Sequence, residues 1–404
     1  MRTNMKTRYF ALLAIFGLAS LVASAREPKT LFPFNVEDGV VISDPANKMS
    51  HASATLINKK GDVFVTHIRD CQNNHEDPSN LTIDLALSKF NIKKYKSGKI
   101  EHSVLLKTGG SIGEFKQDSN YPPYDVFLLD LGDKIRCVFQ ARENGDSVMA
   151  AFDISAEDGK PIGFVDRCRI HYTHNGEKKS VTMTAEAFRE VYTDLGVTNF
   201  VGYERPLLDQ NFTKHGEWYY NVISSWCCAG SVPIVVRTKD GIDYEMVYSC
   251  PEFRYGAAEA AMTIEGERVY IIARTSRPAN KVVRGTFLGV YSLTGQCLCK
   301  PYQIGDIESR PEFLNYDGAV YVMYNVKPNY LLPNGKGANR SRVRLAILND
   351  VGTVERAWEI ASPHSIQYYC LSEYKGDIYL TFGEDRFNRA KAKKGNISFV
   401  KTEL

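Results

Sequence analysis

The stretch AAMTIEGERVYIIAR, residues 260–274, contains the pattern that decides the fold of this chain. An apolar run leads into a turn at Gly266, and a second run follows in which aliphatic and aromatic residues alternate. Alternation with a period of two is typical of a half-buried β-strand, and glycine accepts the positive φ that a tight hairpin turn requires. The stretch therefore predicts a β-hairpin.

The same pattern recurs along the chain. Five more copies occupy residues 54–67, 126–139, 207–221, 311–325 and 369–383, with turns at Gly61, Gly132, Gly216, Gly318 and Gly376. A weaker seventh copy at residues 175–184 turns at Gly176. Successive turns lie 40 to 71 residues apart, and periods of about 40–50 residues with two central strands per unit are typical of propeller blades.

These repeats predict an all-β chain folded as a seven-bladed β-propeller, with six blades as the alternative. A parallel β-helix would need much shorter repeats, and a pair of β-sandwiches is the other architecture that such strands allow. No Pro-, Gly- or Ser-rich linker divides the chain, so we expect residues 26–404 to form a single propeller domain. A short helix is expected over residues 184–195, where Thr184 is a suitable N-cap.

The first 25 residues have the composition of a secretory signal peptide. A positively charged start precedes an apolar run at residues 9–21, and an A-x-A cleavage site ends at Ala25. We therefore expect residues 1–25 to be a signal peptide and the protein to be periplasmic or secreted. No later apolar run approaches the roughly 20 residues needed to cross a bilayer, so membrane insertion is not expected.

The charge of the chain excludes some partners. The formal net charge of +3 comes from the three basic residues of the first 25, so residues 26–404 are neutral. A neutral chain with interspersed charges lacks the basic surface that binds nucleic acid or anionic membranes. We expect a monomer without a nucleic-acid partner.

The nine cysteines do not form a small disulfide framework, because the chain is long enough to build its own core. Their number is odd, and we expect mostly buried thiols on strands, with one or two disulfides allowed. Cys227 and Cys228 are adjacent and cannot easily bridge each other. Cys297-x-Cys299 lacks the companion pair of a zinc site, and we expect no metal and no cofactor.

Polar residues that precede the inner strands of a propeller meet at its central pocket. Arg205, Arg254 and Arg310 hold such positions, with Tyr255 beside Arg254. The guanidinium fork matches a carboxylate, so this set predicts binding of an acidic oligosaccharide or polysaccharide. Ordinary ion pairs between blades are the alternative. Four glutamates lie near these arginines in sequence, namely Glu204, Glu259, Glu308 and Glu312.

Two histidines are further candidates. His51 lies in a small, polar segment before the first apolar strand, where an imidazole can act as acid or base near neutral pH. His75 lies in the polar stretch CQNNHEDPSN, residues 71–80, which is a candidate substrate-binding loop over the pocket. A structural histidine and a solvated loop are the respective alternatives. No third ligand at recognisable spacing accompanies the two as a metal site.

Several familiar catalytic motifs are missing. The chain has no obvious glycosidase carboxylate pair and no S-x-D-x-G-x-T-W Asp box of the sialidase type. It also lacks the G-x-S-x-G elbow, the P-loop and the dinucleotide fingerprint.

Four segments carry a resemblance to a known family. They are FNVEDGVVISDPANKMSHASATLI at residues 34–57, NNHEDP at 73–78, GYERPLL at 202–208 and SRPEFLNYDG at 309–318. Together they resemble the seven-bladed propeller α-L-rhamnosidases of glycoside hydrolase family 145. The resemblance implies hydrolysis of terminal rhamnose α-1,4-linked to glucuronic acid in arabinogalactan. It also implies that one histidine, here His51, is the catalytic residue. In that family the working site lies opposite the usual propeller pocket, which would make the central arginines part of a vestigial pocket.

Two other functions stay open. Propeller polysaccharide lyases share the fold, and His51, His75, Arg254 and Tyr255 resemble the residues with which a lyase eliminates at a uronate. The third possibility is an inactive propeller that binds glycans. All three functions involve an acidic glycan.

Overall fold

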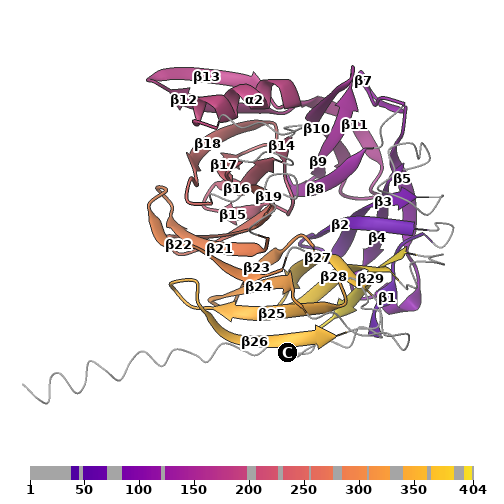
Figure 1. The fold of residues 1–404 in the computed structure, drawn as a ribbon. Coiled ribbons are helices and arrows are strands. Elements are labelled where there is room, and N and C mark those ends of the chain that lie inside the picture. Colours follow the sequence, from indigo (N-terminus) through magenta and orange to yellow (C-terminus); the bar gives the residue numbers. More distant parts are fainter. Residues whose placement is uncertain are drawn as a thin grey trace, which may run out of the picture.

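The computed structural model describes residues 38–44, 49–70, 84–119, 123–197, 206–225, 231–253, 256–275, 284–306, 309–327, 340–361, 365–385 and 395–402. Within these ranges, the strands form six blades around a central axis, each blade built on an inner hairpin (Figure 1). The innermost strands of the first and second blades pack side by side, as do those of the fourth and fifth and of the fifth and sixth, and the innermost strand of the sixth blade packs against that of the first. The chain is therefore a β-propeller, as the repeats predict.

The blades follow one another along the chain. The first consists of β2 (Met49–Ile57), β3 (Asp62–Asp70), β4 (Asp84–Asn91) and β5 (Glu101–Lys107), and the second of β8 (Tyr124–Asp130), β9 (Lys134–Glu143), β10 (Asp146–Ser155) and β11 (Pro161–Arg167). The third contains β14 (Pro206–Leu207), β15 (Thr213–His215), β16 (Trp218–Ser225), β17 (Ile234–Thr238) and β18 (Asp243–Ser249), and the fourth β19 (Ala257–Glu265), β20 (Arg268–Thr275), β21 (Thr286–Ser292) and β22 (Cys297–Gly305). The fifth contains β23 (Glu312–Tyr316), β24 (Ala319–Asn325), β25 (Arg342–Leu348) and β26 (Val354–Ala361), and the sixth β27 (Ser365–Tyr374), β28 (Asp377–Asp385) and β29 (Gly395–Lys401). A two-stranded hairpin of β6 (Ser111–Ile112) and β7 (Phe115–Lys116) and a 3₁₀ turn at Tyr95–Ser97 complete the connections.

The sixth blade is completed by the opposite end of the chain. Strand β1 (Val40–Val41) pairs antiparallel with β29, Val40 opposite Phe399. Directly after β1, the backbone N–H of Ile42 donates to the carbonyl of Ile397 at 2.8 Å. Ile42 is fully buried in a cluster that contains Ile397 and Phe399. Backbone pairing and apolar packing between β1 and β29 thus help to close the ring of blades.

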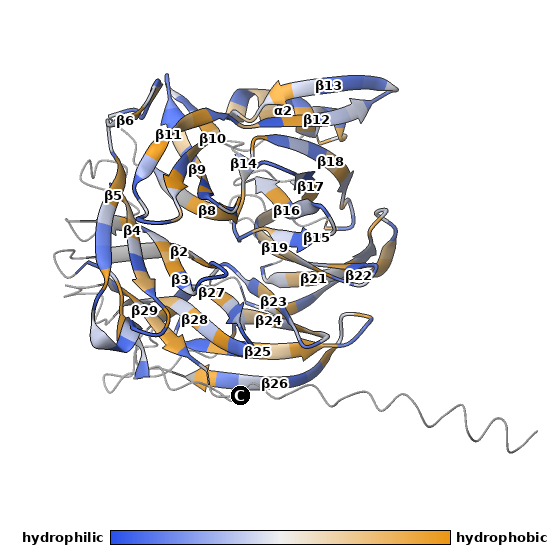
Figure 2. Cartoon of the chain, turned by 180° about the vertical axis from the view of Figure 1, so that it is seen from behind, coloured by the Kyte–Doolittle hydropathy of each residue, from blue (hydrophilic) through white to orange (hydrophobic). Residues whose placement is uncertain are grey.

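The inner hairpins turn at the predicted glycines. Their φ values run from 56° to 98°, the left-handed region that favours glycine, at Gly61, Gly132, Gly216, Gly266, Gly318 and Gly376. Apolar and polar residues alternate along many of the blade strands (Figure 2). The six predicted Gly-led hairpins are therefore confirmed.

The seven-blade prediction is wrong, and the six-blade alternative holds. The weak copy at Gly176 does form a hairpin, of β12 (Arg169–His174) and β13 (Glu177–Thr182), but β12 pairs parallel with β18 and extends the third sheet at its edge. Strand β13 is mostly hydrophilic (Figure 2) and has no buried residue. An inner blade strand must be buried on both faces, which this composition does not allow.

The predicted helix is confirmed as α2 (Ala185–Asp194), and the Thr184 side chain caps it by accepting a hydrogen bond from the backbone of Ala187 at 3.2 Å. No helix among the described residues is long and apolar enough to cross a membrane.

The six described cysteines are all reduced, and four of them are buried. The prediction of mostly buried thiols is therefore confirmed for this part of the chain. Cys71, Cys227 and Cys228 lie outside the described residues.

Polar side chains close the centre of the propeller. Asn211, in the third blade, donates to the carbonyl of Thr55 in the first at 2.6 Å and accepts from the backbone of Leu128 in the second at 3.3 Å. The hydroxyls of Thr55 and Thr381 join the first and sixth blades at 2.7 Å. Such fully hydrogen-bonded buried groups fix the blades relative to one another.

Candidate functional site

Blades four, five and six bring together a group of charged and aromatic residues near the axis, here called the axial cluster. Its members are Glu259 on β19, Arg274 on β20, Arg310 and Glu312 at the start of β23, Arg340 before β25, and Gln367 and Tyr368 on β27. They combine three guanidinium groups with two carboxyls and a phenol.

Two members of the cluster are held by irregular backbone. The pairing of β19 with β20 shifts between Ala258 and Ala260, and that of β27 with β28 shifts between Gln367 and Cys370. Within these shifts, Glu259 has φ 46° and Tyr368 φ 49°. A left-handed backbone costs a non-glycine residue about 1–2 kcal/mol. Bulges of this kind re-aim side chains and concentrate at functional sites, so the strain marks this end of the propeller as a candidate site.

The same irregularity occurs in the first blade. The register of β2 with β3 shifts between His51 and Ser53. His51 therefore stands beside a bulge of the inner strand, as Glu259 and Tyr368 do. The structure describes the backbone of His51 and not its side chain, so its catalytic role stays a prediction.

Arg274 and Glu259 form a buried ion pair. The Nη2 group of Arg274 donates to Oε1 of Glu259, and the two side chains are 7% and 11% exposed. Among the described residues, Oε2 of Glu259 has no hydrogen-bond partner. The pair fixes the Arg274 guanidinium and leaves one carboxylate oxygen for a ligand or water.

Tyr368 lies between two arginines. The guanidinium carbon of Arg340 is 5.2 Å from the centre of the Tyr368 ring, and that of Arg310 is 5.8 Å from it. Arg340 also donates to Oε1 of Gln367 through Nη1, and the backbone N–H of Tyr368 donates to the Ser309 hydroxyl at 3.3 Å. These contacts hold the phenol ring from both the side-chain and the backbone direction.

The pKa of the Tyr368 hydroxyl is set by opposing effects. Burial raises it, the Arg340 and Arg274 charges lower it, and the Glu259 carboxylate raises it. The arginines thus partly offset the cost of forming a phenolate at this buried position.

Glu312 lies deeper in the molecule. Its side chain is buried, and burial raises its pKa from 4.5 to about 8, although the Arg310 charge opposes the rise. At neutral pH this carboxyl is therefore largely protonated and can donate a hydrogen bond.

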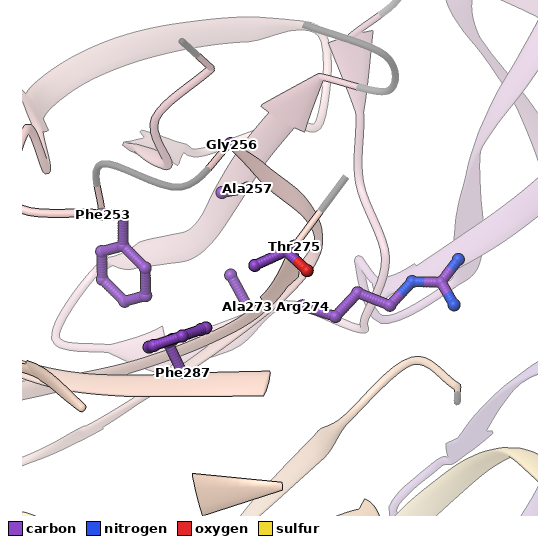
Figure 3. Close-up of a pocket in the computed structure, with 7 residues that line it drawn as sticks. All are labelled: Phe253, Gly256, Ala257, Ala273, Arg274, Thr275 and Phe287. Atoms are coloured by element: carbon purple, nitrogen blue, oxygen red, sulfur yellow. The ribbon is translucent and has the colours of Figure 1, made fainter. Parts of the chain in front are cut away.

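A small apolar pocket lies beside the cluster. It is lined by Phe253, Gly256, Ala257, Ala273, Arg274, Thr275 and Phe287. Figure 3 shows the two phenyl rings together on one side, while the guanidinium of Arg274 extends away from them. The charged part of the site is therefore separate from this apolar gap.

Of the predicted substrate-binding residues, the structure describes Arg310 alone. Arg310 is placed in the cluster, but it is only 2% exposed and lies 5.6 Å above the Phe127 ring, in the floor of the site. A direct contact between Arg310 and substrate stays a prediction. The other predicted substrate-binding residues lie outside the described residues, namely His75, Arg205, Arg254 and Tyr255.

Sequence reasoning missed Arg274, Arg340, Gln367 and Tyr368. Only residues that precede an inner strand were considered, yet the residue that ends the second strand of a hairpin lies at the same end of the blade. Arg274 is the last residue but one of β20, so this rule predicts it as a site residue from the sequence of residues 260–274. Glu259 does orient an arginine, but its partner is Arg274.

Within the described ranges, no group of three or more His, Cys, Asp or Glu side chains is arranged to hold a metal ion.

The comparisons with known proteins show the fold. No protein-family model and no curated protein sequence matches the chain. Among solved structures, a Trypanosoma rangeli sialidase in complex with sialic acid is similar at a TM-score of 0.55 and 9% identity, covering 92% of this chain and 56% of that one. A leech intramolecular trans-sialidase is similar at 0.54 and 11% identity, covering 92% and 70%. The NanB sialidase of Streptococcus pneumoniae is similar at 0.52 and 11%, covering 92% and 71%.

These similarities identify a propeller of the kind that sialidases have. The chain spans little more than half the length of the Trypanosoma rangeli enzyme. Identity near 10% carries the fold alone, so the resemblance to glycoside hydrolase family 145 stays a prediction.

Proposed function

We propose that this protein is a glycoside hydrolase that acts on an acidic glycan. The observation that carries the proposal is the axial cluster, in which three arginines gather around Tyr368. Glu259 balances one of them, and Glu312 is largely neutral at pH 7, so the cluster has an excess of positive charge. A buried positive site of this kind is matched by an anion, and guanidinium groups match a carboxylate best.

The finer proposal concerns the substrate. We assign the enzyme to terminal rhamnose α-1,4-linked to glucuronic acid in arabinogalactan-type glycans, with His51 as the catalytic residue. Two things support this: the resemblance of the segments around His51 and Arg310, and the position of His51 beside a bulge of an inner strand. The glucuronate carboxylate would bind the arginines, and Arg274 and Arg340 are the candidates within the axial cluster. The proposal therefore keeps the catalytic histidine that the resemblance implies and departs from its site on the opposite face.

A second candidate is hydrolysis of a sialic acid linkage. The Trypanosoma rangeli sialidase named above was solved with sialic acid, which also carries a carboxylate. In this chain the Glu259 carboxylate acts electrostatically on Tyr368. A tyrosine nucleophile with a carboxylate that accepts its proton is one known departure from the usual carboxylate pair of glycosidases.

One assay separates these functions. The protein is incubated with rhamnose-capped oligosaccharides from gum arabic and, separately, with 3′-sialyllactose, and the released sugars are identified by chromatography. Released rhamnose supports the finer proposal, and released sialic acid supports the second candidate. Absorbance near 235 nm would instead show a lyase, because elimination leaves an unsaturated uronate. Binding without any product would show a glycan-binding propeller and refute the hydrolase.

A further inference from the structure

Two cysteines from neighbouring blades meet at one tyrosine. Cys250 follows β18 in the third blade, and Cys297 begins β22 in the fourth. Tyr291, on β21, is the direct cross-strand partner of Cys297. Cys250, Tyr291 and Cys297 belong to the same hydrophobic cluster. Side chains of directly paired residues lie on the same face of a sheet, so the Cys297 thiol lies next to the Tyr291 ring.

The third blade wraps around the same tyrosine. The rings of Tyr248 and Phe253 lie 6.1 Å and 6.4 Å from the Tyr291 ring. The Tyr291 hydroxyl donates to Oε2 of Glu252 at 3.2 Å. Cys250 stands in the middle of this segment and is fully buried. Contacts on both sides of Cys250 therefore bring its thiol to Tyr291 as well.

The electrostatics agree with this proximity. Burial raises the pKa of both thiols, and the Glu252 carboxylate raises both further. Cys297 also raises the pKa of Cys250, and the pKa of Cys297 itself is raised by Cys299. The Tyr291 hydroxyl lowers both pKa values. Two thiols that respond to the same carboxylate and the same hydroxyl lie near one another, in agreement with the packing around Tyr291.

We propose that Cys250 and Cys297 form an oxidation site and close into a disulfide that joins the third blade to the fourth. The proposal is independent of the proposed function. It gives a role to Cys297, the first cysteine of the Cys297-x-Cys299 motif. In the structure both thiols are reduced, Cys250 buried and Cys297 partly exposed. The more accessible Cys297 is therefore the thiol that meets the oxidant first.

The chemistry is thiol–disulfide exchange with a small disulfide such as oxidised glutathione. The Cys297 thiolate attacks one sulfur of the oxidant, releases one glutathione thiolate and forms a mixed disulfide. The Cys250 thiolate then attacks the Cys297 sulfur and releases the second glutathione. Two protein thiols are oxidised to one disulfide, and one glutathione disulfide is reduced to two glutathione thiols. The two protons that the protein thiols lose end on the two glutathione thiolates.

Trypsin mapping of the full-length protein tests the pairing. The protein is incubated with oxidised glutathione, remaining thiols are alkylated, and the unreduced digest is analysed by mass spectrometry. Trypsin cleaves after basic residues that no proline follows, which places Cys250 in the peptide 240–254 and both Cys297 and Cys299 in the peptide 285–336. We expect these two peptides to be joined, and dithiothreitol to separate them.

Variants resolve which cysteine of the second peptide is used. Cys299→Ser should keep the cross-link, whereas Cys297→Ser and Cys250→Ala should lose it. The cross-link closes a loop of 47 positions, and we expect oxidation to raise the Tm of the wild type by about 3–8 °C and to leave Cys297→Ser unchanged. A bond between Cys297 and Cys299, a stable glutathione adduct on Cys297, or a bond from Cys250 to any other cysteine would overturn the proposal.

Discussion

At the scale of single residues, the arrangement around Tyr368 determines what the candidate site can bind. Arg340 contacts the phenol from one direction and is held by Gln367, while Arg274 is held by Glu259. Each guanidinium is thus oriented before a ligand arrives, which lowers the entropy cost of binding a carboxylate.

Replacing Arg340 tests the carboxylate assignment. Arg340→Met should lower kcat/KM on the acidic substrate by about 10- to 100-fold, because a hydrogen bond to a charged group contributes about 1.5–3 kcal/mol. On a substrate whose carboxyl is reduced to an alcohol, the same variant should lose little. Arg342→Met, which removes a half-exposed arginine paired with Glu359, is the matched control. Equal losses on both substrates would show that Arg340 acts on the fold and not on the carboxylate.

The role of His51 is tested separately. His51→Ala should abolish release of rhamnose from gum arabic oligosaccharides while the thermal unfolding curve stays that of the parent. His174→Ala removes a half-buried histidine in the hairpin at the edge of the third sheet and should leave turnover unchanged. If His51→Ala cleaves as the parent does, a single catalytic histidine is the wrong mechanism, and the Tyr368 and Glu259 pair becomes the better candidate.

The raised pKa of Glu312 predicts that the free energy of unfolding depends on pH. Its pKa is raised by burial from 4.5 to about 8, so the folded protein binds a proton there that the unfolded chain has lost. The stabilisation from this group is full below pH 4.5 and falls as the pH rises to 8, by at most about 5 kcal/mol. Glu312→Gln should flatten the decline, as measured by denaturant unfolding across this range. Glu359→Gln, at an exposed position, should not.

At the scale of elements, the turns between strands differ in how much the neighbouring blade constrains them. Gly318 and Gly352 have φ of 74° and 80°, but a Cβ at Gly318 would meet nothing within 4 Å. A Cβ at Gly352 would lie 2.5 Å from Cγ2 of Val290 on β21 in the fourth blade. Gly352 therefore belongs to an interface between blades, while Gly318 serves only its own hairpin.

A pair of alanine variants separates the two effects. Both Gly318→Ala and Gly352→Ala incur the left-handed backbone cost of about 1–2 kcal/mol. Gly352→Ala should lose about 1–3 kcal/mol more, the usual cost of overpacking. Chemical denaturation of both variants measures the difference. Equal losses would show that the fourth and fifth blades adjust freely to each other at this contact.

The elements also show where sequence reasoning succeeds and where it fails. A Gly-led hairpin is a local event, so all six inner hairpins were predictable from alternation and turn residues alone. Whether a hairpin starts a new sheet or extends an old one depends on which edge it meets, and this is not encoded locally. The β12–β13 hairpin was therefore counted as a blade, although it pairs with β18. Arg340 was missed for a related reason, since its position depends on a contact with Tyr368 in the next blade.

At the scale of the whole molecule, a strand of two residues adds to the closure that β2 and β27 make at the axis. Strand β1 contributes Val40 and Val41, and the adjacent Ile42 is buried between β29 and the first blade. Few backbone hydrogen bonds join β1 to β29. Most of the stabilisation between these two segments must therefore come from side-chain packing.

Ile42→Ala tests this closure. Removing a buried isoleucine side chain usually costs about 2–5 kcal/mol, and here the loss should also promote opening of the ring. We expect a lower Tm and faster hydrogen exchange in β29 than in the middle strands of the fourth blade. Val41→Ala, at a position 38% exposed, is the control and should change both little. A lower Tm without faster hydrogen exchange in β29 than in the fourth blade would contradict this account of the closure.

The pairing of β1 with β29 has a consequence for how the protein is made. A ribosome makes β1 before the first five blades and β29 after them, so the sixth blade lacks a strand until all the other blades have been made. Until then, the edges of the first blade and of the unfinished ring are open to other chains. A transcript cut short before residue 395 would leave the ring permanently open, and its product should be a substrate for proteases even though five blades are intact.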